Sequence, residues 1–238
     1  MNIAVVGAGR AGTSFSIALT RVGHRVNLAH HEQTADLGPY DVVILAVPDD
    51  EIEATAQQLG YHDDQVVAHV AGSRTLAVLG QHPRVGSMHP LATLPSGECG
   101  ASRLIGATYA VAGDERILRV VESLDGRVLR IADERRTAYH ATATVAANHV
   151  VALMGHVSRL AESAGLELAD FWPLVQMALA DVVAVGPAAA LTGPASRGDT
   201  ATIDAHLAAI LESERSTYLA LANAALSLAE RRRSQTRA

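Results

Sequence analysis

Three glycines near the N-terminus have the spacing of a phosphate-binding turn. The segment Val5–Gly12 reads V-V-G-A-G-R-A-G and follows directly on the apolar run Asn2–Val6. Gly7 allows a tight turn, Gly9 lets the backbone approach a pyrophosphate, and Gly12 permits close packing of helix on strand. The free amide groups at the start of the next helix would hold the phosphates. We therefore expect a nicotinamide dinucleotide at this turn.

A second segment, Ala46–Asp50 (A-V-P-D-D), ends a continuously apolar strand. Ligands of parallel sheets bind at this carboxyl edge, so its backbone is expected to line the dinucleotide. Asp49 or Asp50 could also cap the next helix. The residues expected to contact the cofactor are Gly7, Ala8, Gly9, Arg10, Ala11, Gly12, His30, His31, Ala46, Val47 and Pro48.

The choice of cofactor depends on the end of the second strand. NAD-binding proteins usually place an acid there, whereas this strand is followed by His30 and His31. Imidazoles can stack on adenine or donate hydrogen bonds to a 2′-phosphate, so we expect NADP(H), with NAD as the alternative. Glu32 would favour NAD if the strand extends further.

Two residues near strand ends could meet a substrate beside the nicotinamide. His89 lies in the segment G-S-M-H-P-L at 86–91. An ordinary histidine pKa of about 6.5 suits proton donation to a carbonyl, and the structural alternative is a histidine that orders its loop. Ser73 in A-G-S follows another strand and is expected either to contact the substrate or to form a turn.

A polar stripe occurs in the alanine-rich segment 139–148, Y-H-A-T-A-T-V-A-A-N. His140, Thr144 and Asn148 are spaced i, i+4, i+8 and should share one helix face. Asn148 offers a donor and an acceptor to a substrate carbonyl or hydroxyl. Hydrogen bonds between helices are the alternative explanation of this stripe.

The segment 191–199, L-T-G-P-A-S-R-G-D, is expected to be a loop between two helices. Arg197 presents a planar guanidinium suited to a carboxylate, which indicates a small carboxylate substrate. Thr192 and Ser196 could add hydroxyl groups to that site. Asp199 is expected to be the N-cap of the following helix.

Hydrophobic patterning divides the chain into two parts. Apolar runs alternate with helical patterns in the first half, which predicts an α/β Rossmann domain with a mostly parallel sheet. The β pattern ends near Ala132, and a helix of about 30 residues is then expected over Asp133–Ala164. We expect a dinucleotide-binding domain at 1–132 and an all-α C-terminal domain for substrate binding and dimerisation at 133–238. The expected strands are Asn2–Val6, Arg25–Ala29, Asp41–Val47, Gln65–Val70, Val85–Met88, Thr108–Val111 and Arg127–Ile131.

Composition excludes several classes of function. The net charge of −6 argues against nucleic acid as a partner. All 19 basic residues are arginine, which rules out any mechanism that needs a lysine amine. The single Cys99 is expected to be a small residue in a glycine-rich loop rather than a nucleophile. We expect no metal site, no run apolar enough to cross a membrane, and a cytoplasmic location.

The assembled motifs resemble a family within the superfamily of 6-phosphogluconate dehydrogenase-like oxidoreductases. The similarity is to Rossmann proteins with a helical C-terminal domain, among them the alternative type of ketopantoate reductase. It is carried by G-A-G-R-A-G, A-V-P-D-D-E-I, the H-P at 89–90, Y-H-A-x-A-x-x-A-x-N at 139–148 and L-T-G-P-x-x-R-G-D at 191–199. The wider superfamily often has a lysine four residues before an asparagine, and this chain has Thr144 at that place before Asn148.

The resemblance implies an NADPH-dependent reductase of a small 2-oxo acid, with ketopantoate as the best single candidate. The resemblance carries over Asn148, which would orient the carbonyl, and Arg197, which would hold the carboxylate. It leaves the proton donor open, and we expect His89 ahead of His140 in that role. An imine reductase of the pyrroline-5-carboxylate type and a noncatalytic dinucleotide-binding regulator are the alternatives. The long alanine-rich helix also suggests a homodimer.

Overall fold

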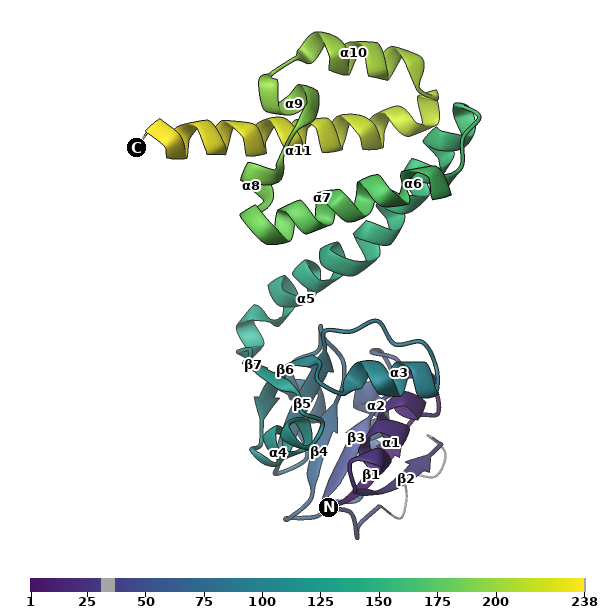
Figure 1. Cartoon of the computed structure of the whole chain (residues 1–238). Coiled ribbons are helices and arrows are strands. Elements are labelled where there is room, and N and C mark those ends of the chain that lie inside the picture. Colours follow the sequence, from purple (N-terminus) through teal and green to yellow (C-terminus); the bar gives the residue numbers. More distant parts are fainter. Residues whose placement is uncertain (31–36, 238) are drawn as a thin grey trace. The chain divides into compact units, whose positions relative to one another are not determined.

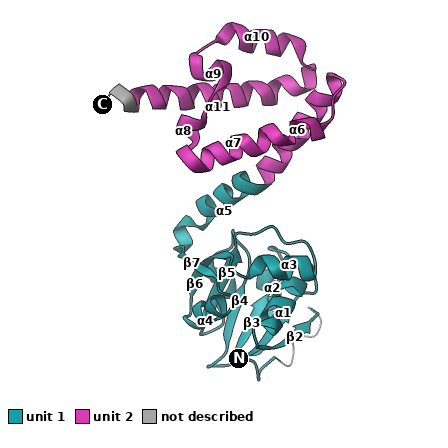
Figure 2. Ribbon diagram, viewed as in Figure 1, with its two compact units in different colours: residues 1–147 teal, residues 148–238 magenta. Residues whose placement is uncertain are grey.

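The computed structural model describes residues 1–30 and 37–237, which form two compact units (Figure 2). The first unit comprises residues 1–147 and the second residues 148–238. The division lies later than Ala132, where the strand pattern ends, because helix α5 (Arg136–Thr144) makes its contacts with residues of the first unit.

A seven-stranded sheet forms the centre of the first unit (Figure 1). The strand order is β2-β1-β3-β4-β5-β6-β7, and all neighbours are parallel except β5 and β6. This confirms the expected α/β Rossmann fold with a mostly parallel sheet. The strands are β1 Asn2–Val6, β2 Arg25–Ala29, β3 Val42–Leu45, β4 Val66–His69, β5 Val85–Pro90, β6 Thr108–Gly113 and β7 Arg127–Arg130.

Helices cover both faces of this sheet because strand residues point alternately to opposite sides. Ile3 and Val5 of β1 pack with helices α1, α3 and α4, whereas Ala4 and Val6 pack with α2 and the 3₁₀ turn η2. The central strands β1 and β3 are therefore apolar on both faces, as the sequence pattern predicts for Asp41–Val47. The helical segments are α1 Arg10–Arg21, α2 Ile52–Gln58, η2 Leu76–Leu79, α3 Glu98–Leu104, α4 Arg116–Ser123 and η3 Asp133–Arg135.

Helix α3 is a correction to the sequence analysis. Cys99 lies in its first turn and is exposed, so it is not part of a glycine-rich loop. The preceding Gly97 has a φ of +69° and begins the helix. Gly100 is buried against Ser14 of α1, and Leu104 is buried in the core. The apolar positions in this segment are too few for the sequence pattern to reveal the helix.

The topology creates a crevice at the carboxyl ends of the central strands. β1 pairs with β2 on one side and with β3 on the other. Helix α1 follows β1 on one face of the sheet, and α2 follows β3 on the opposite face. Ligands of open α/β sheets bind where the strand order reverses in this way. The glycine turn after β1 stands at that point.

The second unit is entirely helical, as expected for an all-α C-terminal region. Its longest helix, α11, spans Glu212–Arg237 and contacts α8 and α9. The segment 191–199 is not all loop, because Gly193–Arg197 forms the short helix α9. The remaining segments are α6 Val150–Ser163, η5 Leu168–Phe171, α7 Trp172–Val185, α8 Pro187–Ala190 and α10 Thr200–Ala209.

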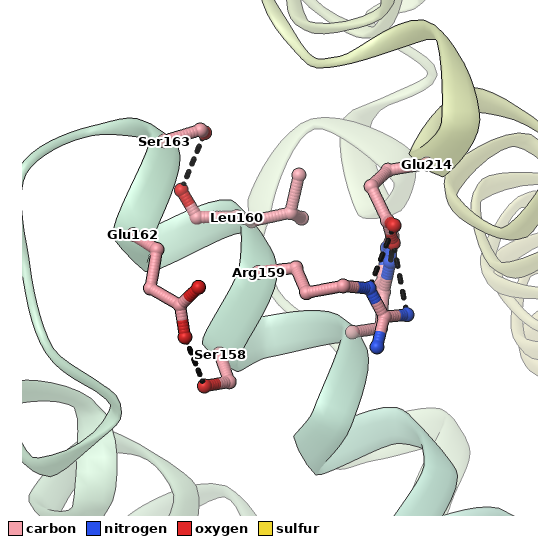
Figure 3. Close-up of polar contacts among 7 residues, drawn as sticks. Ser158, Arg159, Leu160, Glu162, Ser163 and Glu214 are labelled. Carbon is pink, nitrogen blue, oxygen red and sulfur yellow. Dashed lines mark hydrogen bonds and ion pairs between the residues drawn. The ribbon is translucent and has the colours of Figure 1, made fainter.

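An ion cluster joins helices α6 and α11 in this unit (Figure 3). His156 donates from Nδ1 to Glu214 Oε2 at 2.6 Å, and Arg159 donates from Nε to Glu214 Oε1 at 2.7 Å. His156 and Glu214 are both buried. The hydrogen bond from Arg159, followed by that from His156, lowers the pKa of Glu214 to about 2. The buried carboxylate is therefore charged and ties the two helices together.

Helix α7 and the turn before it are the most exposed apolar segment of the second unit. Among the described residues, Leu168–Val185 is the one stretch that is long and apolar enough to cross a membrane by length and composition. No residue of this stretch is buried. The stretch includes Asp170, Gln176 and Asp181, so it is not a continuous apolar run of the kind that the sequence analysis expected to be absent. Length and composition alone do not distinguish a membrane segment from a helix that packs against another protein surface.

The long helical run after Asp133 is interrupted at its middle. Residues Val145–His149 form a π-helical turn between α5 and α6. The expected i, i+4, i+8 face assumed a continuous α-helix, so that spacing is wrong between Thr144 and Asn148. π-Helical turns are frequent at functional sites, and this one contains Asn148.

Candidate active site at the carboxyl edge of the sheet

Two of the three turn glycines are required by close packing. Gly7 has a φ of +108°, and a Cβ on it would lie 2.6 Å from the carbonyl oxygen of Ala46. A Cβ on Gly12 would overlap the carbonyl oxygen of Gly7. The turn is also tied to β2, because Gly7 donates its N–H to Ala29 at 2.9 Å. These contacts are the structural roles that the sequence pattern predicts for the first and third glycines.

Gly9 differs because the space beside it is open. A Cβ on Gly9 would meet nothing within 4 Å, and the φ of −73° at Gly9 is available to any residue. Gly9 is the N-cap of α1, and within the described residues no side chain caps this helix and no acid lies in its first turn. The helix therefore presents amide groups and a positive dipole end to open space. This geometry fits a diphosphate lying over Gly9.

The end of β3 lies directly against the turn. Ala46 donates its N–H to Val6 at 2.8 Å, and Val47 Cγ1 lies 3.2 Å from the position of a Gly7 Cβ. Pro48 is exposed at the same edge. The segment expected to line the cofactor is therefore adjacent to the turn.

Asp49 connects two neighbouring loops rather than capping a helix. Its Oδ2 accepts a hydrogen bond from Ser73 at 2.6 Å. The N-cap of α2 is Glu51, and no side chain caps that helix within the described chain. The expectation that Asp49 or Asp50 caps α2 is therefore wrong. Ser73 is placed instead at the carboxyl edge, beside the loop that follows β3.

Of the two histidines expected at the end of β2, the structure describes His30. His30 follows Ala29 directly and is exposed. Because β2 is hydrogen-bonded to β1, this position lies at the same edge as the glycine turn. His31 and Glu32 lie outside the described residues.

A pocket of about 260 Å³ connects the glycine turn with His89. Arg10 and Ala11 from the start of α1 line it, and so do His89 and Pro90 at the end of β5. Phe15 of α1 contributes apolar surface. The pocket thus brings residues of the first turn of α1 next to the imidazole proposed from the sequence.

His89 belongs to a cluster of three aromatic side chains. Its Nδ1 is 2.7 Å from the hydroxyl of Tyr139, and the two rings meet edge to face at 85°. The ring of His140 lies on another side, with centroids 5.9 Å apart. Gly72 makes room for both imidazoles, since a Cβ there would lie 2.6 Å from His140 and 2.9 Å from His89.

The surroundings of His89 change its expected protonation. Burial, followed by the proximity of His140 and of the Arg136 guanidinium, lowers the pKa of His89 to about 4. The imidazole is therefore neutral near pH 7. The expectation of an ordinary pKa of about 6.5 is wrong because it ignored this burial. A neutral imidazole can still donate one hydrogen bond and accept one.

Tyr139 remains protonated over the same range of pH. Burial raises the pKa of its hydroxyl to about 12, although the Arg136 guanidinium acts in the opposite direction. Sequence reasoning quoted Tyr139 within its motif but gave it no role. The signal available in the sequence was that Tyr139 directly precedes His140. Because α5 begins at this strand end, both side chains can reach it.

Arg136 fixes the start of α5 at this edge. Its guanidinium is completely buried and donates to Ser87 Oγ of β5, to the Ala71 carbonyl at 3.4 Å and to Asp133 at 3.0 Å. Asp133 also accepts the N–H of Leu76 at 3.0 Å. This network holds the helix that carries Tyr139 and His140. Sequence reasoning missed Arg136 because nothing in a pattern distinguishes a buried arginine from an exposed one.

A second buried histidine lies below the same edge. His69 at the end of β4 is completely buried. Burial, with a smaller effect of the Arg136 guanidinium, lowers the pKa of His69 to about 4. Its imidazole is therefore neutral as well, and Arg136 is the cation common to His69 and His89.

The other expected site residues belong to the second unit. Asn148, Thr192 and Arg197 are exposed there. Ser196 donates its hydroxyl to the Gly193 carbonyl at 2.8 Å within α9. Asp199 accepts the N–H of Thr202 at 3.1 Å, which confirms that it is the N-cap of α10. The candidate active site of the first unit is therefore formed by residues of that unit.

Comparison with solved structures agrees with the fold. A presumed NADP oxidoreductase from Bacteroides fragilis is 20% identical, with 95% of this chain and 98% of that chain covered and a TM-score of 0.79. A protein from Thermotoga maritima is 22% identical over 97% and 99% of the two chains, with a TM-score of 0.76. The 1-pyrroline-5-carboxylate reductase of Streptococcus pyogenes is 15% identical over 95% and 98%, with a TM-score of 0.64. At these identities the likeness concerns the fold.

The sequence comparisons are narrower. No curated protein matches the chain. One family model matches residues 107–225, which make up half of the chain and include Arg136, Tyr139, His140, Asn148 and Arg197. The chain therefore belongs to the family described as a domain of unknown function, DUF2520.

Proposed function

We propose that this protein is an NADP(H)-dependent oxidoreductase that reduces a small carbonyl compound. One observation carries the proposal: a single pocket contains both the first turn of the glycine-turn helix and the neutral imidazole of His89. A dinucleotide whose diphosphate lies over Gly9 would extend from the turn toward that imidazole. The best single candidate for the substrate is the 2-oxo acid ketopantoate, on the strength of the motif resemblance.

The chain's own residues fit the cofactor. The backbone around Gly7 and Gly9 would hold the diphosphate, with Ala46–Pro48 beside it. Arg10 and His30 are exposed groups available to a 2′-phosphate. When bound, the reduced cofactor supplies a hydride to the substrate. The presumed NADP oxidoreductase that shares the fold supports the choice of NADP(H) over NAD.

The role of His89 follows from its charge state. As a neutral imidazole it donates a hydrogen bond to the substrate oxygen and polarises the carbonyl, without acting as a cation. Ser73 lies at the same edge, where its hydroxyl donates to Asp49 and can still accept a hydrogen bond. From the sequence motifs we further propose that Asn148 orients a carbonyl and that Arg197, with Thr192 and Ser196, holds a carboxylate.

An imine reductase of the pyrroline-5-carboxylate type is the second candidate. The fold similarity to 1-pyrroline-5-carboxylate reductase favours it. A protonated imine, however, presents a hydrogen-bond donor and needs an acceptor. A carbonyl oxygen is the better match for a donor at His89.

The test is a substrate panel with NADPH oxidation as the readout. The purified protein is incubated with ketopantoate, other 2-oxo acids and pyrroline-5-carboxylate. Turnover of a 2-oxo acid supports the proposal, and turnover of the imine alone supports the second candidate. NADPH binding without turnover of any compound would indicate a noncatalytic regulator. Tighter binding of NADH than of NADPH would contradict the choice of cofactor.

We further propose that the protein is a cytoplasmic homodimer whose contact includes α7. This helix exposes large apolar side chains that a second copy would cover, among them Trp172, Leu174, Met177, Leu179 and Val183. A dimer in sedimentation without detergent supports this proposal. A monomer in buffer, or recovery of the protein only with the membrane fraction, would contradict it.

A further inference from the structure

The proposed reduction needs a proton as well as a hydride, and the chain offers few sources. There is no lysine in the sequence. His89 touches the pocket but has a pKa of about 4, so at neutral pH it carries no extra proton to give. A neutral imidazole can deliver a proton from one nitrogen only if another group returns one to the second nitrogen.

Tyr139 is placed to be that group. Its hydroxyl is 2.7 Å from Nδ1 of His89. The hydroxyl is protonated, so it can donate to Nδ1 when the neutral imidazole carries its proton on Nε2. The remaining proton of the imidazole then resides on Nε2, which can donate to a substrate oxygen. In that tautomer the pair forms a directed chain of hydrogen-bond donors from the phenol to Nε2, which lies beside Gly72.

We propose that Tyr139 is a positioning residue that fixes His89 as the Nε2–H tautomer and supplies the reaction proton through it, an inference that rests on the proposed function. As the hydride reaches the carbonyl carbon, the C=O π electrons move to oxygen. That oxygen takes the proton from Nε2, while Nδ1 takes the proton from the Tyr139 hydroxyl. The products are an alcohol, oxidised cofactor, the Nδ1–H tautomer of His89 and a tyrosinate, which is reprotonated by water.

The charges around the pair suit this transfer. An alkoxide is a stronger base than a tyrosinate, so the transfer runs toward the alcohol. The Arg136 guanidinium, fully buried at the start of the same helix, acts to lower the pKa of Tyr139 and so stabilises the transient tyrosinate. Asp49 and His140 are the other titratable groups that act on the His89 ring, and neither contacts the phenol through a hydrogen bond among the described residues.

The chain provides a matched control. His206 and Tyr218 form a pair of similar geometry in the second unit, with Nδ1 and the hydroxyl 2.6 Å apart and rings at 87°. Tyr218→Phe removes the same hydroxyl from the same kind of pair within the second unit. Tyr139→Phe keeps the aromatic ring against His89 and removes only the oxygen, so it should preserve the packing of α5.

The first measurement is the tautomer of His89 by ¹⁵N NMR of histidine-labelled protein without ligands, with the signal assigned by His89→Gln. The expected result is Nε2–H in the wild type and in Tyr218→Phe, and a mixture of tautomers in Tyr139→Phe. An Nδ1–H tautomer in the wild type would overturn the proposal. Because this readout needs no substrate, it is independent of whether the proposed function is right.

The second measurement is the pH profile of kcat on the substrate that the panel identifies. Tyr139→Phe should lower kcat at neutral pH on the order of a hundredfold. Its residual rate should fall about tenfold per pH unit above pH 5, because only the imidazolium form of His89 can then donate. The wild type and Tyr218→Phe should show a flat profile. A Tyr139→Phe variant with a normal and flat profile would overturn the proton route, even if the tautomer is as expected.

Discussion

Replacing Gly9 by alanine separates cofactor binding from folding. The added Cβ meets no protein atom within 4 Å, and the backbone φ of −73° suits alanine. Losing glycine at an N-cap costs about 1 kcal/mol, and the reduced freedom of the unfolded chain offsets about 0.4–1 kcal/mol of that. The free energy of unfolding should therefore change by less than about 1 kcal/mol.

The cofactor, in contrast, should feel the methyl group directly. It occupies the space in which a phosphate oxygen would approach the amides of α1. Loss of one hydrogen bond to a charged group costs about 1.5–3 kcal/mol, which raises the Kd for NADPH roughly tenfold to a hundredfold. Titration by NADPH fluorescence gives the Kd, and thermal unfolding followed by circular dichroism gives the stability.

Two other glycines serve as references for this experiment. Gly155→Ala places a methyl group at an ordinary 3.5 Å from Arg159 in α6 and should change neither quantity strongly. Gly12→Ala should destabilise the fold itself, because its Cβ would overlap the Gly7 carbonyl. If Gly9→Ala bound NADPH with the wild-type Kd, the diphosphate would not lie over Gly9 and the reasoning about the turn would be refuted.

Two further predictions concern stability. Arg136→Met leaves the buried Ser87 hydroxyl and Ala71 carbonyl without their cation, so the free energy of unfolding measured with urea should fall by about 3 kcal/mol. Arg135→Met, at the exposed neighbouring position, should cost little. Equal small losses in the two variants would contradict the anchoring role of Arg136. Glu214 has its pKa lowered from 4.5 to about 2, so its contribution to stability is complete above pH 4.5 and is lost as the pH falls toward 2. Glu214→Gln should remove that part of the acid dependence of the melting temperature, and an unchanged acid dependence would show that the cluster in Figure 3 does not stabilise the fold.

The fold could be predicted from the sequence because the strong signals were local. The strands at Asn2–Val6 and Arg25–Ala29 were predicted with the bounds that the structure has. Continuous apolar runs and a glycine turn specify a parallel sheet without reference to distant residues. The short helices α3 and α9 were missed because a helix of five to seven residues contains too few periods to show.

The chemistry of the site was less accessible to prediction. The sequence identified His89 and His140 as candidates, but not the pKa of about 4 that burial imposes on His89. Burial and then the proximity of His140 are the larger causes of that value. Arg136 adds to them, although it is 47 positions away in the chain, and it reaches the site through β5 and Ser87. Tyr139 acquires its role in the same way, from the place where α5 begins. Asn148 and Arg197 stay predictions, since the first unit alone does not test them.

The most direct test of the account is an amide NMR titration of the full chain with NADPH. The largest shifts are expected at the amides of residues 9–13 and of Ala46, Val47 and Asp49, with smaller shifts near His89. Saturable binding that leaves the amides of the glycine turn unmoved, or no binding at millimolar NADPH, would contradict this expectation.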